Sequence, residues 1–227
     1  MRKRTAVFLA LVVVLVLGIA AMASGIAATP ALTASRTAVV YPHSMSLVSN
    51  VSTPSVIQRR LAGSDAWVDF IAVPSGNTTR TIKPTSTAAY KVVSDGVDSD
   101  TVTVTVAAQL SKPQVNKHGH KGHKLTIKGW VAPMHRSGDV QLKFFRWEKV
   151  GTVLVTKRHG KSKTIAKYEW VQHGDTVNAS LFRQNSQRSK WSYKWTPSAK
   201  GTWKIVVSHE DVAHVYSSAS AKTVIKR

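Results

Sequence analysis

The sequence predicts an all-β protein built from two tandem β-sandwich domains. Beyond residue 29, short runs rich in valine, threonine, isoleucine and aromatic residues alternate with glycine, proline, asparagine and serine, and no window repeats apolar residues at helical spacing. The length of 227 residues leaves room for two domains, since a domain usually holds about 100–150 residues. Many short strands in so little chain are typical of sandwiches.

Charge and cysteine content narrow the function classes. The chain contains no cysteine, so disulfide scaffolds, thiol catalysis and thiolate zinc sites are excluded. The net charge is +21, yet residues 30–108 are close to neutral, with six basic residues against five acids. Residues 109–227 hold 23 basic residues against six acids. This half is expected to attract polyanions, although charge alone does not choose among nucleic acid, anionic lipid and wall polymer.

Residues 1–23 have the three parts of an export signal. Basic residues at 2–4 precede an uncharged, apolar stretch at 6–23, and Ala21 and Ala23 offer the small side chains that a signal peptidase reads. The apolar stretch is long enough to span a bilayer, so an uncleaved signal anchor is the alternative. In both cases the basic start predicts that the rest of the chain is exported, to the medium or the cell surface.

The first domain is predicted over residues 30–108. Its clearest strand is 101–106, where three valines that would face the core alternate with three threonines. A turn is expected at Asp95-Gly96. The other expected strands lie at 38–41, 44–48, 56–60, 67–72, 79–83 and 89–93.

Two motifs in this half carry a resemblance to a known family. The stretch VIQRRLAGSDAWVDFIAV places Gln-Arg-Arg at a strand end before a tryptophan-containing strand, and residues 83–90 read Lys-Pro-Thr-x-Thr-x-x-Tyr ahead of the last two strands. On these residues the segment 30–107 resembles the bacterial immunoglobulin-like repeats of secreted and surface proteins. The resemblance implies an immunoglobulin-like sandwich and a place outside the cytoplasm.

The second domain is predicted over residues 124–227, after a basic linker rich in histidine and glycine at 109–123. In KWSYKW the aromatic side chains of Trp191, Tyr193 and Trp195 fall on one face, which is expected to be buried. The segment 158–188 is longer and more polar than a sandwich needs. Strands are expected at 124–131, 139–147, 151–157, 192–196, 202–208 and 221–226.

This half also carries a family pattern. Its stretches are VAPMHRSGDVQLKFFRWEKVG and YKWTPSAKGTWKIVVSHEDVAHVYSSASAKTVIK. The Pro-x-His-x-x-Gly turn at 133–138, the Lys-Gly-Thr-Trp strand at 200–203 and the paired His209 and His214 resemble a basic immunoglobulin-like module found near the end of secreted Gram-positive proteins. The resemblance implies a fold and a location, and no activity or ligand.

Two histidine clusters are candidate metal ligands. In HGHKGH, the rings of His118, His120 and His123 are close enough in sequence to converge on Zn(II), Cu(II) or Ni(II), but interleaved lysines repel a cation and no carboxylate orients a ring. The segment is therefore interpreted as a linker. His209, Asp211 and His214 offer two nitrogens and an oxygen that suit zinc. The favoured interpretation is a loop in which the aspartate caps a turn and the rings pack against strands, so no metal is expected.

A basic run and two tryptophans are the candidate ligand contacts. The run belongs to a hairpin and could form part of a cationic face; its residues are Lys157, Arg158, Lys161, Lys163 and Lys167. Trp147 and Trp170 are the candidates for exposed stacking platforms, because rings flanked by cations suit sugars or bases. No nucleic-acid fold signature accompanies them, so nucleic acid is not the expected partner.

These observations favour an exported binding or structural protein that is not an enzyme. No nucleophile elbow, triad context or paired carboxylates are present, and no cofactor is implied. The second domain is expected to contact anionic envelope polymers, such as teichoic-type chains, or glycans. The alternatives are an adhesin that binds protein through its first domain, and accessory domains of an envelope-associated enzyme system. Membrane contact is expected only through the N-terminal segment.

Cleavage after Ala23 predicts Ser24 as the first residue of the exported protein. Intact-mass spectrometry of protein collected outside the cell measures this directly. A mass that includes Met1 would indicate an anchored chain.

Overall fold

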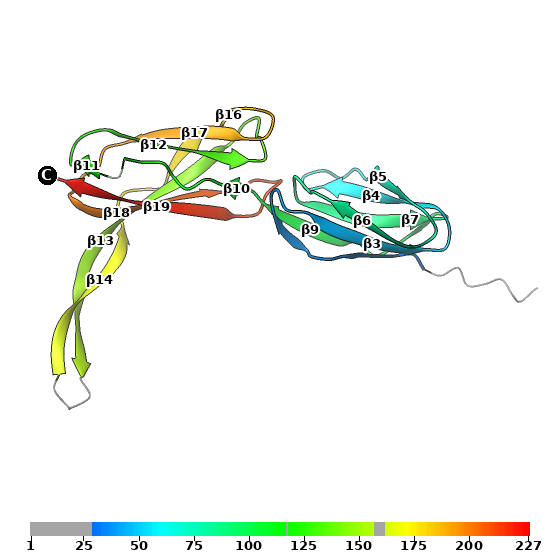
Figure 1. The fold of residues 1–227 in the computed structure, drawn as a ribbon, viewed down its shortest axis with the longest axis horizontal. Helices are drawn as coiled ribbons and strands as arrows, with labels where there is room; N and C mark the ends of the chain where they lie inside the picture. Colours follow the sequence, from blue (N-terminus) through cyan, green and yellow to red (C-terminus); the bar gives the residue numbers. More distant parts are fainter. Residues whose placement is uncertain (1–28, 117, 157–161) are drawn as a thin grey trace, which may run out of the picture.

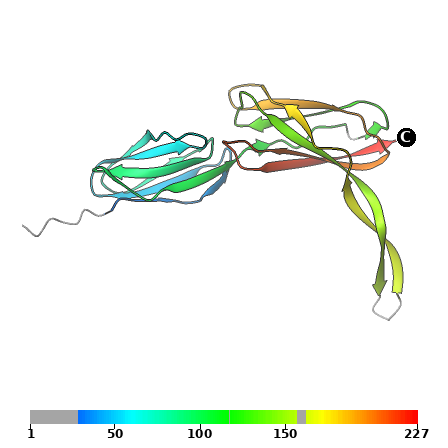
Figure 2. The ribbon, with the colours of Figure 1, turned by 180° about the vertical axis from the view of Figure 1, so that it is seen from behind.

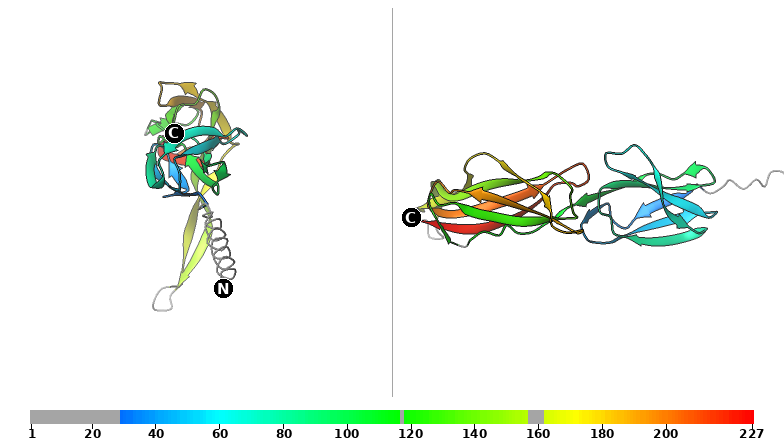
Figure 3. Two further views of the ribbon diagram at one scale, coloured as in Figure 1. Left: turned by 90° about the vertical axis from the view of Figure 1, so that its right-hand side faces the viewer. Right: turned by 90° about the horizontal axis from the view of Figure 1, so that it is seen from above.

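The computed structural model describes residues 29–116, 118–156 and 162–227, and all regular structure within them is β. Two β-sandwich domains lie end to end (Figures 1 and 3). The predicted all-β fold with two sandwiches is therefore confirmed. The export segment lies outside the described residues. In the described part of the chain, no helix is long and apolar enough to cross a membrane.

The first sandwich contains one sheet in the order β1-β3-β6 and another in the order β2-β9-β7-β4-β5, with β8 beside β7. Taken in chain order, β1, β3 and β6 face β4, β7 and β9, which is the division of an immunoglobulin sandwich. The strands are β1 (Ala31–Ala34), β2 (Ala38–Val40), β3 (Met45–Val51), β4 (Ser55–Leu61), β5 (Val68–Val73), β6 (Gly76–Ile82), β7 (Ala88–Ser94), β8 (Val97–Asp98) and β9 (Val102–Ala107).

The second sandwich repeats this arrangement, with sheets β10-β12-β17-β16 and β11-β19-β18-β13-β14, and with β15 beside β13. In both domains a short strand pairs in parallel with the last one, β2 with β9 and β11 with β19. The strands are β10 (Gln109–Leu110), β11 (His118–His120), β12 (Leu125–Ala132), β13 (Asp139–Thr156), β14 (Ser162–Gln172), β15 (Val177–Ser180), β16 (Phe182–Arg183), β17 (Ser189–Trp195), β18 (Gly201–His209) and β19 (Ser217–Lys226).

Alternating apolar residues form both cores, as the pattern predicts. In β9, Val104 and Val106 are fully buried, and Asp95 and Gly96 form the expected turn before it, both with positive φ. In the second domain, Trp191 is only 1% exposed. These side chains fill the space between the sheets, where apolar burial supplies the main stabilisation.

Two sequence predictions need correction. The segment 109–123 is not simply a linker, because β10 pairs with β12 and β11 pairs with β19 inside the second sandwich. The expected strands 139–147 and 151–157 form one strand, β13, with a bulge between Lys149 and Gly151. At the bulge one extra residue, Val150, is left unpaired, and pairing with β14 resumes at Gly151 instead of ending there.

The two domains contact each other through the loop between β18 and β19, residues 210–216. The backbone N–H of Thr87 donates to the Ala213 carbonyl at 2.7 Å, and the N–H of Val215 donates to the Val106 carbonyl at 2.9 Å. Backbone hydrogen bonds of this kind fix both position and direction. The loop therefore sets the position of the second domain relative to the first.

Replacing Gly129 with alanine should destabilise the second domain. A Cβ there would lie 2.5 Å from Cζ2 of the buried Trp191 and 2.7 Å from Oγ of Ser111, so the core must shift. Overpacking of this kind costs about 1–3 kcal/mol. Denaturant unfolding followed by tryptophan fluorescence measures the change. Gly151→Ala is the control, because no atom lies within 4 Å of its Cβ; equal losses in both variants would contradict the packing explanation.

Candidate functional site

Strands β13 and β14 extend beyond the second sandwich as a two-stranded ribbon (Figures 1 and 2). β13 pairs with β18 only as far as Arg146, and from Trp147 onward its partner is β14 alone. Several apolar side chains on the ribbon are exposed, and Leu154 is 65% exposed. Since an isolated hairpin is marginally stable and exposed apolar side chains in a group mark interaction sites, this element is a candidate binding surface.

One outward face of the second domain combines aromatic rings with lysines. Directly paired residues share a sheet face, so Lys222, Lys204 and Phe145 form a row across three strands. Trp147 pairs with Trp170, and Tyr168 pairs with Lys149, on the adjoining part of the ribbon. We name this the lysine–aromatic face; it consists of Lys149, Lys204, Lys222, Phe145, Trp147, Tyr168 and Trp170.

The two candidate tryptophans differ in how accessible their ring faces are. Trp147 is 45% exposed and stacks beside Tyr168, with ring centroids 6.1 Å apart and an angle of 14°. The Nζ atoms of Lys204 and Lys222 lie 5.1 and 5.4 Å from the Trp170 ring centroid. Cations within this range are attracted to the ring. Trp147 is thus the accessible platform, whereas Trp170 positions two lysines.

The described members of the basic run do not lie on that face. Lys157, Arg158 and Lys161 fall outside the described residues. Lys163 and Lys167 are exposed on β14, but they pair with Val155 and Gly151 and so occupy the opposite side of the ribbon from Tyr168.

Lys167 also forms an ion pair with a neighbouring carboxylate. Its Nζ lies 2.6 Å from a Glu169 oxygen. Of the predicted cations that the structure describes, Lys163 alone has no ion pair.

The histidines of HGHKGH do not form a ligand set. His118 and His120 lie exposed on β11, and Nδ1 of His120 is 2.8 Å from the Arg227 carbonyl oxygen. The rings of His120 and His123 have centroids 5.8 Å apart. The segment serves instead as a sheet edge.

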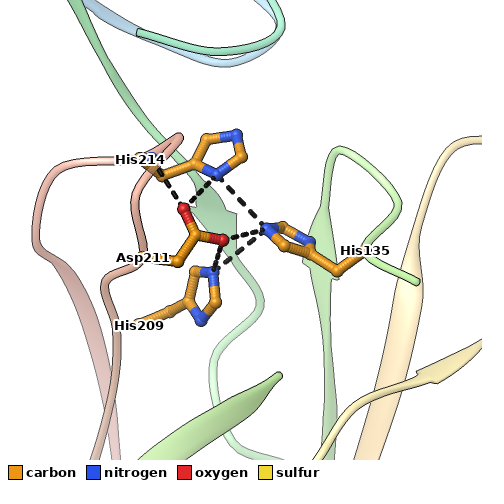
Figure 4. Close-up of side chains that lie close together, drawn as sticks. All are labelled: His135, His209, Asp211 and His214. Atoms are coloured by element: carbon orange, nitrogen blue, oxygen red, sulfur yellow. Dashed lines mark hydrogen bonds and ion pairs between the residues drawn. The ribbon is translucent and has the colours of Figure 1, made fainter. Parts of the chain in front are cut away.

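The second candidate cluster does converge, and it gains a member. His209, Asp211 and His214 meet His135, and one ligand atom from each residue lies within 4.8 Å of all the others (Figure 4). The three rings are buried, and the aspartate is partly exposed. In the described parts of the chain, no other group of three or more histidines and carboxylates converges in this way.

Hydrogen bonds to the surrounding protein position three members of the cluster. The Ser189 hydroxyl accepts a hydrogen bond from the backbone N–H of His135 and donates to its carbonyl, at 2.9 and 2.8 Å. Oδ1 of Asp211 accepts the N–H groups of Ala213 and His214 at 2.8 and 2.7 Å, which confirms the expected turn cap. Nδ1 of His209, at the end of β18, lies 3.0 Å from the Asp139 carbonyl oxygen.

Burial and mutual charge set the ionisation of the cluster. Burial lowers the pKa of His135, and the nearby His209 and His214 lower it further. Asp211 and a hydrogen bond with the Pro133 carbonyl act in the opposite direction and raise this pKa, but by less. Burial alone would raise the pKa of Asp211, but His214, His209 and His135 together lower it. The site therefore favours a neutral imidazole at His135 beside a charged carboxylate.

Sequence reasoning missed His135 as a ligand and missed Lys149, Lys204 and Lys222. The histidine lies in the 133–138 turn, 74 residues from His209, and only the fold brings the two together. The lysines alternate with apolar residues in their strands, which signals an outward face, but the register between strands is needed to place them beside the tryptophans.

In comparisons with known proteins, the chain matches no protein family and no curated protein. Among solved structures it is similar to trypsin-activated alpha-2-macroglobulin from Escherichia coli, with 10% identity, a TM-score of 0.35, and coverage of 86% of this chain and 17% of that one. The human OSCAR ligand-binding domain gives 15% identity, a TM-score of 0.27, and coverage of 86% and 97%.

Red sea bream transglutaminase gives 10% identity, a TM-score of 0.33, and coverage of 88% and 32%. The chain thus spans only a fraction of the macroglobulin and the transglutaminase. Likenesses this weak carry no argument about function. The class of the protein rests on its own sheets: two immunoglobulin-type β-sandwiches, an architecture compatible with a binding or structural role.

Replacing Ser189 with alanine should destabilise the second domain by about 1–3 kcal/mol, because the buried N–H of His135 loses its acceptor. Denaturant unfolding measures the loss. Ser192→Ala on the same strand is the control, since Ser192 is exposed and should change the free energy of unfolding by less than about 0.5 kcal/mol. If the two variants lose equally, Ser189 does not hold the His135 turn.

Proposed function

We propose that the protein is an exported, non-enzymatic binding protein whose second domain contacts anionic envelope polymers or glycans through the lysine–aromatic face. The observation that carries this proposal is the ribbon, which holds Trp147 and Tyr168 outward beside three lysines. An aromatic ring offers a stacking surface for a sugar, and lysines attract phosphate or carboxylate groups along a polymer.

The charge distribution supports the same partner class. The second half of the chain carries nearly all of the excess positive charge, and the export pattern at residues 1–23 predicts that this charge lies outside the cytoplasm, where wall polymers are found. The Coulomb field of the second domain raises the local concentration of a polyanion. The aromatic rings then distinguish a polymer that contains sugars from one that does not. Loops and projecting elements on rigid sandwiches are common carriers of binding.

Binding to purified wall polymer should weaken linearly in log affinity with log salt, because bound cations release counterions. Changing Lys149, Lys204 and Lys222 to glutamine should reduce the slope by about 2–3, at roughly 0.7–0.9 per contact. Trp147→Ala should weaken binding and leave the slope unchanged, since stacking releases few ions. A titration at several salt concentrations measures affinity and slope together.

A matched control removes the same charge elsewhere. Lys121, Lys124 and Lys226 are exposed near the C-terminal end of the sandwich, where the Lys121 N–H bonds to the Lys226 carbonyl. Their triple glutamine variant should keep most of the slope and affinity. The proposal would be contradicted if the two triple variants had equal effects. It would also be contradicted if the protein bound inorganic polyphosphate, a polyanion without sugars, as tightly as wall polymer, because the positive charge would then act only by non-specific attraction.

A further inference from the structure

We propose that His135, His209, Asp211 and His214 form a Zn(II) site that fixes the junction between the two domains. This site is separate from the lysine–aromatic face and does not depend on polymer binding. Its ligand atoms are buried histidine nitrogens and one carboxylate oxygen, drawn from the turn after β12, the end of β18 and the loop before β19 (Figure 4).

Four of the six distances among the ligand atoms are close to those of tetrahedral zinc. Nε2 of His135 lies 3.0 Å from Nε2 of His209, 3.3 Å from Nδ1 of His214 and 3.2 Å from Oδ2 of Asp211. Nε2 of His209 lies 3.3 Å from the same Asp211 oxygen. Zinc bonds of about 2.0–2.1 Å in a tetrahedron separate neighbouring ligand atoms by about 3.3–3.4 Å. The side chains already stand near that spacing.

The outer hydrogen bonds direct lone pairs into the cluster. Nδ1 of His209 faces the Asp139 carbonyl oxygen at 3.0 Å, and a carbonyl only accepts, so that nitrogen carries the proton and Nε2 keeps a lone pair. Nε2 of His214 faces the Thr85 carbonyl oxygen at 2.9 Å and so carries a proton, while its Nδ1 lies 2.9 Å from Oδ1 of Asp211. In a neutral ring this Nδ1 has a lone pair that can bind a metal. Carbonyl groups behind histidines are the usual means of orienting metal ligands.

With all three rings neutral, the centre of the cluster has more acceptors than protons. Nε2 of His135 has one hydrogen at most, yet two imidazole lone pairs and the carboxylate of Asp211 lie within 3.3 Å of it. Its Nδ1 is buried and makes no hydrogen bond of normal geometry, although the Pro133 carbonyl acts on the ring. A divalent cation bound to Nε2 satisfies all four acceptors at once and places the His135 proton on Nδ1.

The donor set selects the metal and its role. Three imidazoles and one carboxylate suit zinc, and four protein ligands close its coordination, as in structural rather than catalytic sites. His214 contacts Thr85 of the first domain through its other nitrogen, and its neighbours Ala213 and Val215 make the backbone bonds between the domains. Metal binding would therefore fix the loop at residues 210–216, and with it the relative orientation of the two domains.

The test uses tag-free, chelator-treated protein titrated with Zn(II) in a calorimeter and with Co(II) in a spectrophotometer. We expect one metal per chain and the intense visible bands of four-coordinate cobalt. Asp211→Asn keeps an oxygen for the N–H groups of Ala213 and His214 but loses the charge, and should lower the affinity by more than about 100-fold, beyond the loss typical of an outer-shell partner.

The control is the triple variant His118→Ala, His120→Ala, His123→Ala, which removes three histidines and should bind zinc like the wild type. His135→Asn, which keeps the backbone clamp to Ser189, is a second ligand variant should Asp211→Asn not fold. Small-angle scattering of the wild type should show a narrower distribution of overall dimensions with zinc than without. Absence of stoichiometric binding, or loss of binding in the triple variant alone, would overturn the site.

Discussion

Packing of large aromatic rings between the sheets of the second domain is the interaction on which its outward features depend. Trp195 stacks on Phe144 of β13 at 4.9 Å and meets Trp203 of β18 edge to face at 5.1 Å. With no cysteine in the chain, this contact does what an inter-sheet disulfide does in many immunoglobulin domains. It sets the positions of β13, which continues into the ribbon, and of β18, which ends at His209.

Strand positions could be predicted from the sequence because they depend on local patterns. Alternation placed Val104 and Trp191 in the two cores, and Asp95-Gly96 marked a turn that needs positive φ. The strands within the segment 109–123 were harder to predict. β10 and β11 are only two and three residues long, and they form because they pair with strands far along the chain. Short edge strands carry little signal of their own.

The candidate sites could be predicted only in part, since they depend on register and topology. The sequence pointed to His209, Asp211 and His214, but the fourth ligand, His135, comes from another loop. It pointed to Trp147 and Trp170, but not to the lysines of β18 and β19 that lie over Trp170. Lys167 was expected to contribute to a cationic face, and its ion pair with Glu169 follows from neighbouring positions on one strand face.

The ribbon also leaves backbone unpaired along its length. From Trp147 onward, the described parts of β13 and β14 bond only to each other, so each strand has an open outer edge that a strand from another chain could join. Lysines spaced along β14 and the bulge after Lys149 oppose such joining, because like charges repel and a bulge increases the local twist. The positive charge that we propose attracts anionic partners would thus also oppose edge-to-edge pairing between copies of this protein.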